Sequence, residues 1–97
     1  KVLSLMDALK KMTLLPAQRL ESISPQLINK GRIRVGADAD ITMFDPDRII
    51  DKANYANGGN VPSEGVVYVM VGGVFVVKDR RVLEGVFPGK AILSRTE

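Results

Sequence analysis

The chain has 97 residues, of which 14 are basic and 11 acidic, and it contains neither cysteine nor histidine. This length allows one domain, or part of one, with a modest hydrophobic core. The missing cysteine excludes disulfides and thiolate metal sites, and the missing histidine removes the most common metal ligand and general base, so any hydrolytic centre would have to use carboxylates, lysines or hydroxyls.

The chain begins with a helical pattern. Ser4 and Asp7 have the spacing of a capping box, and apolar residues three or four positions apart follow them. Pro16 suits the first turn of a second helix, where its missing N–H has no partner in any case. We therefore predict two short helices, over residues 4–12 and 15–22, each apolar on one side.

From residue 31 onward the pattern changes to strands and turns. Residues 32–35 alternate between basic and apolar side chains until Gly36, and residues 40–45 alternate again until Pro46. Residues 46–65 are rich in glycine, proline and asparagine, which predicts a long surface loop.

The clearest element is a β-hairpin. Two β-branched runs, residues 66–71 and 74–77, are separated by Gly72 and Gly73, which suit a tight turn with positive φ at both central residues. A short strand is predicted at residues 82–84, and a last short apolar run follows at residues 91–93. The sequence thus predicts a mainly β fold, with two short N-terminal helices followed by a small β-sandwich.

Four aspartates lie close together in the sequence: Asp38, Asp40, Asp45 and Asp47. They do not match a calcium loop, because Thr42 and Met43 stand where a third acidic residue and a glycine are required. A strand would also hold Asp40 and Asp45 about 16 Å apart, at a rise of roughly 3.3 Å per residue. We therefore expect Asp38 and Asp40 to accept hydrogen bonds from nearby backbone N–H groups at the start of a strand.

Other patterns give no active site either. A serine nucleophile would need a lysine base here, and no Ser-x-x-Lys spacing occurs. Gly58 and Gly59 lack the preceding strand and following helix of a phosphate-binding loop. No apolar run reaches the roughly 20 residues of a membrane span. We expect a cytoplasmic protein with no membrane partner. The chain opens on Lys1 instead of methionine, which suggests part of a longer protein.

Several segments together resemble the C-terminal end of the amidohydrolase superfamily. They are KMTLLPAQRL at 11–20, KGRIRVGADADITMFDP at 30–46, PSEG at 62–65, VMVGGV at 69–74 and GVFPGK at 85–90. The resemblance covers nearly the whole chain and leans toward the N-acyl-D-amino-acid deacylases (D-aminoacylases), with dihydroorotase-like and hydantoinase-like enzymes as neighbours. Its structural signature consists of Gly36, Asp38, Asp40, Gly72, Gly73 and Gly89.

The resemblance implies a fold and a function. In that superfamily a metal-dependent (β/α)₈ barrel carries catalysis, and a small β-sandwich assembled from both chain ends flanks it. Residues 1–25 would then be helices from the end of the barrel, and residues 26–97 the C-terminal part of the sandwich. The family's metal ligands, including an early His-x-His pair, lie upstream. No catalytic, metal-binding or substrate-binding residue and no cofactor is therefore expected in this chain. Zinc or another divalent metal is implied for the longer enzyme, which would hydrolyse the amide C–N bond of N-acyl-D-amino acids.

Partners follow from the same resemblance. The chain would pack against the barrel and the N-terminal strands of the longer enzyme, and in isolation its unpaired strand edges favour self-association.

Two rival hypotheses remain. One is a self-standing β-rich module that binds nucleic acid through a basic face of Lys30, Arg32, Arg34, Lys78, Arg80 and Arg81, although a net charge of +3 is weak support. The other is a carboxylate-based hydrolase, which would need two acids in one cleft with shifted pKa values.

Overall fold

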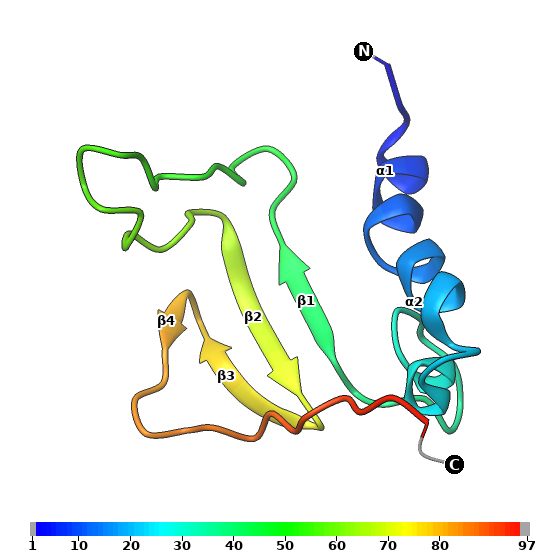
Figure 1. Ribbon diagram of the computed structural model, residues 1–97. Coiled ribbons are helices and arrows are strands. Elements are labelled where there is room, and N and C mark those ends of the chain that lie inside the picture. The colour runs from blue at the N-terminus through cyan, green and yellow to red at the C-terminus, as the bar shows by residue number, and fades with distance from the viewer. Residues whose placement is uncertain (1, 96–97) are drawn as a thin grey trace. The chain divides into compact units, whose positions relative to one another are not determined.

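The structure is a computed structural model that describes residues 2–95. These residues form two compact units, a helical unit and a sheet unit (Figure 1). The helical unit contains the residues up to 39 together with those from 90 onward, and the sheet unit contains residues 40–89.

Two consecutive helices open the helical unit, as predicted. Helix α1 covers Leu5–Met12 and helix α2 covers Leu14–Leu20. Ser4 caps α1, because its hydroxyl oxygen accepts a hydrogen bond from the backbone N–H of Asp7 and its hydroxyl donates to the Asp7 carboxylate. A short 3₁₀ helix, η1, follows at Pro25–Asn29. The predicted helical start and its cap are therefore confirmed.

The two helices are separated at Thr13 because Pro16 lacks the N–H that a continuous helix would bond to the carbonyl of Met12. Thr13 is the C-terminal cap of α1 and the N-terminal cap of α2. Its hydroxyl donates to the carbonyl of Leu9 at 2.7 Å. Within residues 2–95, no helix is both long and apolar enough to cross a bilayer.

The end of the described chain belongs to the helical unit, and no strand forms at residues 91–93. The backbone N–H of Leu93 donates to the side-chain oxygen of Gln26, and the carbonyl of Leu93 accepts from the hydroxyl of Ser24. The N–H of Arg95 donates to the carbonyl of Ile23. The backbone of this last apolar run finds its partners beside η1 instead of along a sheet.

The strand predicted at residues 32–35 is also absent. The chain turns there, with the N–H of Ala37 donating to the carbonyl of Arg34 at 3.1 Å. Ile33 and Val35 are exposed. Alternation alone does not make a strand, since a strand needs a neighbour for its backbone groups, and the described residues provide none here.

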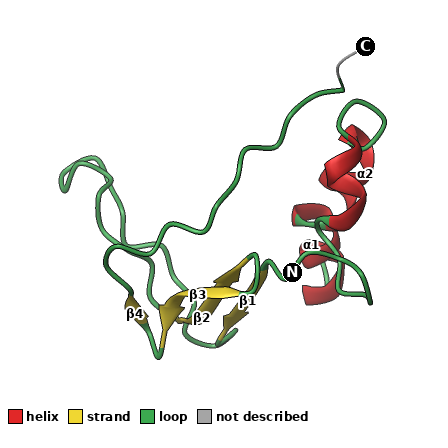
Figure 2. Cartoon of the chain, turned by 90° about the horizontal axis from the view of Figure 1, so that it is seen from below, coloured by secondary structure: helices red, strands yellow, loops and turns green. Residues whose placement is uncertain are grey.

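The sheet unit is a four-stranded antiparallel meander in the order β1-β2-β3-β4 (Figure 1). Its strands are β1 at Ile41–Phe44, β2 at Val66–Val71, β3 at Val74–Lys78 and β4 at Arg81–Val82. Figure 2 shows these strands as one layer. The mainly β architecture after two short helices is confirmed, and the predicted strand at residues 82–84 begins one residue earlier and is shorter.

The register is set by the β2–β3 hairpin. Gly72 and Gly73 have φ values of 55° and 82°, which match the predicted tight turn, and Val71 pairs with Val74 across it. Tyr68 and Phe75 lie on the hairpin with ring centroids 5.8 Å apart. The hairpin therefore has both the turn residues and the aromatic contact that stabilise an antiparallel pair.

A second tight turn joins β3 to β4 and uses two non-glycine residues. Asp79 and Arg80 have φ values of 50° and 67°, a left-handed conformation that costs a side-chain-bearing residue roughly 1 to 2 kcal/mol. Lys78 pairs with Arg81 on either side of the turn.

Replacing Arg80 with glycine is therefore expected to stabilise the sheet unit. Glycine adopts this φ without strain but loses more backbone entropy on folding, so the net gain in the free energy of unfolding is about 0.5 to 1 kcal/mol. Urea denaturation followed by circular dichroism measures it. Arg81→Gly, in the neighbouring strand, should destabilise the unit instead, and a gain from Arg81→Gly equal to that from Arg80→Gly would contradict the explanation.

Little of the chain is buried. Among the described residues, Ala17 is the buried apolar side chain and Ser24 the buried polar one. All six residues of β2 are apolar or aromatic and all are half-buried, so both faces of this central strand retain exposed apolar surface. Continuous apolar strands of this kind are typical of sheets covered on both faces.

The accessible surface is correspondingly large. The chain exposes 7981 Å², whereas a compact monomer of 10.6 kDa exposes about 5,500 Å² and two separate globules of half that mass expose about 6,600 Å² together. The excess, about 1,400 to 2,500 Å², persists whichever reference is used, so it arises within the units themselves. A standard interface buries about 1,200 to 2,000 Å² in total, or about 800 Å² on each partner, so this excess is larger than the share that one partner contributes.

Candidate functional site

Asp40 joins the start of β1 to the β2–β3 turn. Its carboxylate oxygen Oδ1 accepts a hydrogen bond from the backbone N–H of Gly72 at 2.8 Å. The two residues are 32 positions apart, so this contact fixes the end of β1 against the hairpin. As predicted, the carboxylate accepts from a backbone N–H, but from the turn of the neighbouring hairpin instead of from an adjacent residue.

Asp38 lies in the helical unit and behaves differently. Its carboxylate forms an ion pair with the ammonium of Lys30 at 3.0 Å, and its own backbone N–H donates to the carbonyl of Asn29. The expected acceptance of a backbone N–H by this side chain is not seen. This ion pair spans the turn that contains Gly36. Lys30, which the sequence suggested for a nucleic-acid-binding face, is therefore paired within the protein.

The remaining two aspartates shape the loop after β1. The carboxylate of Asp45 accepts from the backbone N–H of Asp47 at 3.0 Å, which is an Asx turn. The backbone carbonyl of Asp45 accepts from the N–H groups of Arg48 and Ile49. Both contacts are local and hold the backbone in a tight turn after the strand.

No group of three or more acidic side chains in residues 2–95 is placed to hold a metal ion. The zinc or other divalent metal implied by the family resemblance therefore does not fit the described residues of this chain, and no step of hydrolysis is assigned to them.

Removing the Asp40 carboxylate is expected to destabilise the sheet unit moderately. Asp40→Ala leaves the N–H of Gly72 without this acceptor and should lower the free energy of unfolding by about 1 to 2 kcal/mol, because a hydrogen bond to a charged group contributes about 1.5 to 3 kcal/mol and this one is exposed to solvent. Asp40→Asn keeps an oxygen acceptor and should cost less than half as much. Equal losses for the two variants, measured by denaturant unfolding, would show that this hydrogen bond is not the cause.

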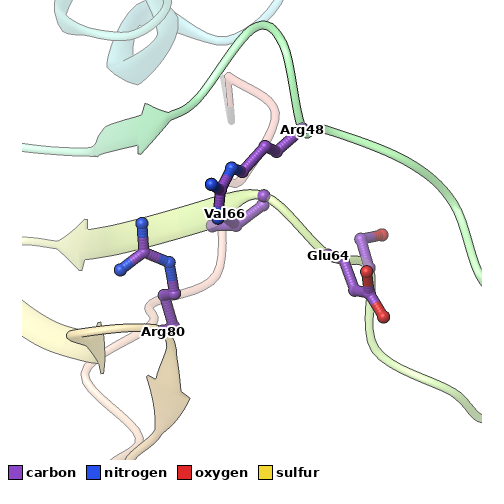
Figure 3. Close-up of a pocket in the computed structure, with 6 residues that line it drawn as sticks. Arg48, Glu64, Val66 and Arg80 are labelled. Carbon is purple, nitrogen blue, oxygen red and sulfur yellow. The ribbon is translucent and has the colours of Figure 1, made fainter.

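A hollow of about 400 Å³ lies at the start of β2. It is lined by Arg48, Ser63, Glu64, Gly65, Val66 and Arg80 (Figure 3). Arg48 comes from the loop after β1 and Arg80 from the β3–β4 turn, and both guanidinium groups extend toward Val66. We call this feature the two-arginine hollow.

Gly65 brings the walls of the two-arginine hollow together. It has a φ of 88°, and a Cβ added to it would lie 2.5 Å from both the N and the Cα of Ile49. The backbones on the two sides of the hollow are joined by hydrogen bonds from Asp45 N–H to the Gly65 carbonyl and between Ile50 and Glu64 in both directions. Only glycine permits this close approach, which places Arg48 beside the first residue of β2.

The side chains proposed for nucleic-acid binding lie in both units, and in the helical unit they have intramolecular partners. Arg32 donates to Glu21 and to the carbonyls of Lys30 and Leu27, and Arg34 donates to the carbonyl of Ile28. The sheet unit contains the other three of the six basic residues, namely Lys78, Arg80 and Arg81. The hypothesis of one basic face stays a prediction.

Sequence reasoning missed Arg48 and Gly65. The signal available was Gly65 itself, a glycine immediately before a β-branched strand, which often marks a close backbone approach. Of the glycines in the predicted signature, Gly36, Gly72 and Gly73 have positive φ, and nothing lies within 4 Å of a Cβ added to any of these three or to Gly89. Their roles in the family remain predictions.

Comparison with curated proteins found two relatives. The chain is 41% identical over 88 residues to a dihydroorotase of Pelotomaculum thermopropionicum, which covers 81% of this chain and 19% of that protein. It is 37% identical over 76 residues to an N-acyl-D-glutamate deacylase of Alcaligenes xylosoxydans xylosoxydans, which covers 78% of this chain and 14% of that protein. No protein-family model matches, and no solved structure matches significantly.

Both relatives are amidohydrolases, so these similarities support the superfamily to which the sequence segments pointed. The chain spans less than a fifth of the length of either relative.

Proposed function

From its similarity to two amidohydrolases, we propose that this chain is a non-catalytic part of a metal-dependent amidohydrolase. The proposed role is structural: the helical and sheet units would pack against the remainder of a longer protein, which would carry the metal and the reaction. One observation carries the proposal. Each alignment covers about four-fifths of this chain but less than a fifth of the relative's length.

Two features of the chain support this role. The aspartates that could have formed a catalytic cluster contact backbone N–H groups or a lysine instead, through Asp38, Asp40 and Asp45. The exposed surface exceeds that of a compact monomer by about 2,500 Å², which is more than the roughly 800 Å² that one partner contributes to a standard interface. A part that packs against a larger body needs such apolar surface and does not need reactive groups.

For the longer enzyme we propose hydrolysis of the amide C–N bond of an N-acyl-D-amino acid. Water would add to the acyl carbonyl carbon, the C–N bond would break, and a carboxylic acid and an amine would leave. A zinc or other divalent ion bound outside this chain would supply Lewis-acid activation of that water. The name of the second relative, N-acyl-D-glutamate deacylase, supports this substrate class, and dihydroorotate is the alternative substrate suggested by the first. A cytoplasmic location remains part of the proposal.

The test uses the full natural chain that contains these residues. We expect it to release the amine from N-acetyl-D-glutamate, and to lose this activity when a chelator removes its metal. Asp38→Asn, Asp40→Asn and Asp45→Asn in that chain should each change kcat/KM less than about threefold, because a catalytic acid or base contributes roughly 10² to 10⁴.

The outcomes separate the parts of the proposal. Turnover of dihydroorotate without turnover of the acylated amino acid would contradict the substrate class but not the structural role. A hundredfold loss in any of the three aspartate variants, with folding intact by circular dichroism, would contradict the non-catalytic role.

A further inference from the structure

The two-arginine hollow of the sheet unit contains two cationic groups whose neighbouring carboxylates, on Asp45 and Asp79, lie beyond good hydrogen-bond distance. We propose that Arg48 and Arg80 form one binding site for an oxyanion, in which both guanidinium groups contact the same carboxylate or phosphate group. The proposal concerns a site that is independent of the amidohydrolase reaction.

The side chains of Arg48 and Arg80 line the same hollow. Arg48 and Arg80 come from segments more than 30 residues apart, and both extend toward Val66 at the start of β2 (Figure 3). Backbone hydrogen bonds fix where each side chain begins: the N–H of Arg48 donates to the carbonyl of Asp45 at 3.1 Å, and the N–H of Arg80 donates to the carbonyl of Val67 at 2.9 Å. Two like charges are thus brought to one hollow by the fold itself.

The guanidinium N–H groups of both arginines are available to donate hydrogen bonds to a ligand. Arg48 Nε lies 3.6 Å from the Asp45 carboxylate and Arg80 Nη1 lies 4.0 Å from the Asp79 carboxylate, both beyond a good hydrogen bond. Within residues 2–95, neither guanidinium donates a hydrogen bond to another group of the protein. Guanidinium groups have five N–H donors in a planar fork that matches a carboxylate or phosphate.

Glu64 is the acidic residue that lines the hollow, and its carboxylate does not pair with either arginine. The Glu64 carboxylate points away from the two arginines in Figure 3 and lies 3.9 Å from the ammonium of Lys52. Ser63 adds a hydroxyl to the lining. The hollow therefore combines two cations with a neutral donor.

The backbone of Arg80 is held in a fixed conformation. Arg80 is held at a φ of 67°, where a glycine would be less strained. This conformation belongs to the tight turn between β3 and β4, so the turn fixes the backbone position from which the Arg80 side chain starts.

The expected affinity is modest because both arginines are partly exposed, with 74% and 56% of their side-chain surface accessible. We expect free phosphate or acetate to bind in the millimolar range, and more weakly as ionic strength rises. The same chemistry would serve a carboxylate side chain of a longer protein that contains this chain. Both sources present an oxyanion to the same two guanidinium groups, and the experiment distinguishes them.

Phenylglyoxal modification of arginine, mapped by mass spectrometry, tests the site residue by residue. In the 97-residue chain at constant ionic strength, phosphate and acetate should each slow the modification of Arg48 and Arg80 severalfold, with chloride as the reference anion. Arg81 lies in β4 outside the hollow and should react at an unchanged rate, so it is a control within the same molecule.

Variants test whether the two arginines act together. Arg48→Gln should abolish the protection of Arg80 by phosphate, and Arg80→Gly should abolish the protection of Arg48. Arg80→Gly is informative because it is expected to raise the stability of the sheet unit, so loss of protection could not come from unfolding. Asp79→Asn removes the carboxylate that lies 4.0 Å from Arg80 Nη1 and should lower the phosphate concentration needed for half-protection of Arg80.

The source of the oxyanion follows from the same measurement on the full natural chain. If Arg48 and Arg80 react as in the 97-residue chain and phosphate protects them, the ligand is a free anion. If they react slowly without phosphate and 1 M sodium chloride restores their reactivity, a carboxylate of the protein occupies the hollow. The proposal is overturned if phosphate slows Arg81 as much as Arg80, or if Arg48→Gln leaves the protection of Arg80 unchanged.

Discussion

Replacing Gly65 with alanine is expected to lower the free energy of unfolding of the sheet unit by about 3 kcal/mol or more. One part of this cost is the φ of 88°, which a residue with a Cβ rarely adopts. The other part is steric, because the new methyl carbon would lie 2.5 Å from the N and Cα of Ile49 and 2.6 Å from the carbonyl carbon of Arg48. These are backbone atoms, so no side-chain rotation relieves the contact.

Gly85→Ala is the matched control for Gly65→Ala. Gly85 lies in the same unit and has a φ of 73°, but nothing lies within 4 Å of a Cβ added to it. Its replacement should cost only the conformational part, roughly 1 kcal/mol. Urea denaturation of the three proteins, followed by circular dichroism, measures both losses. Equal losses would mean that the loop after β1 does not approach β2 as closely as described.

The isolated 97-residue chain is expected to self-associate. β1 is an edge strand, paired only with β2 among the described residues, and β2 exposes apolar side chains on both faces. Unpaired edges and uncovered apolar sheets are the surfaces through which β proteins pair with other chains. Because the excess exposed surface is larger than the roughly 800 Å² that one partner contributes to a standard interface, we expect a dimer or a larger species in sedimentation velocity at micromolar concentration.

A charge on β1 tests the route of association. Met43 is 53% exposed on β1, and Met43→Lys should shift the equilibrium toward monomer, because a lysine on an edge strand opposes edge-to-edge pairing. Tyr55→Lys is the control, since Tyr55 is fully exposed in the loop outside the strands. A compact monomer over a wide range of concentration would contradict the prediction. An equal shift in both variants would indicate a general effect of charge.

The elements that sequence predicts correctly are those with local causes. The Ser4 cap of α1, the separation of the helices before Pro16 and the Gly72–Gly73 turn each depend on residues within one turn of the chain. Their hydrogen bonds close over three or four residues, so the residue types that make them can be recognised without the rest of the fold.

The errors concern segments whose backbone needs a distant partner. Residues 32–35 alternate as a strand would, yet they form no strand in the described structure. Likewise the sequence gives Asp40 an acceptor role but cannot identify its donor, since the N–H of Gly72 is 32 residues away. The candidate site was missed for the same reason: Arg80 was proposed only as part of a basic face and Arg48 was not singled out, since the two side chains line one hollow only in the folded sheet unit.

By itself, the sequence determined the kinds of chemistry open to this protein and the positions of its caps and tight turns. Without histidine or cysteine, and with its aspartates at strand and turn boundaries, it excluded the usual catalytic and metal centres. Only the tertiary structure decided which segments pair and which side chains converge, because pairing depends on backbone groups that are far apart along the chain. The close approach at Gly65, the two-arginine hollow and the uncovered faces of β2 all follow from such long-range pairing.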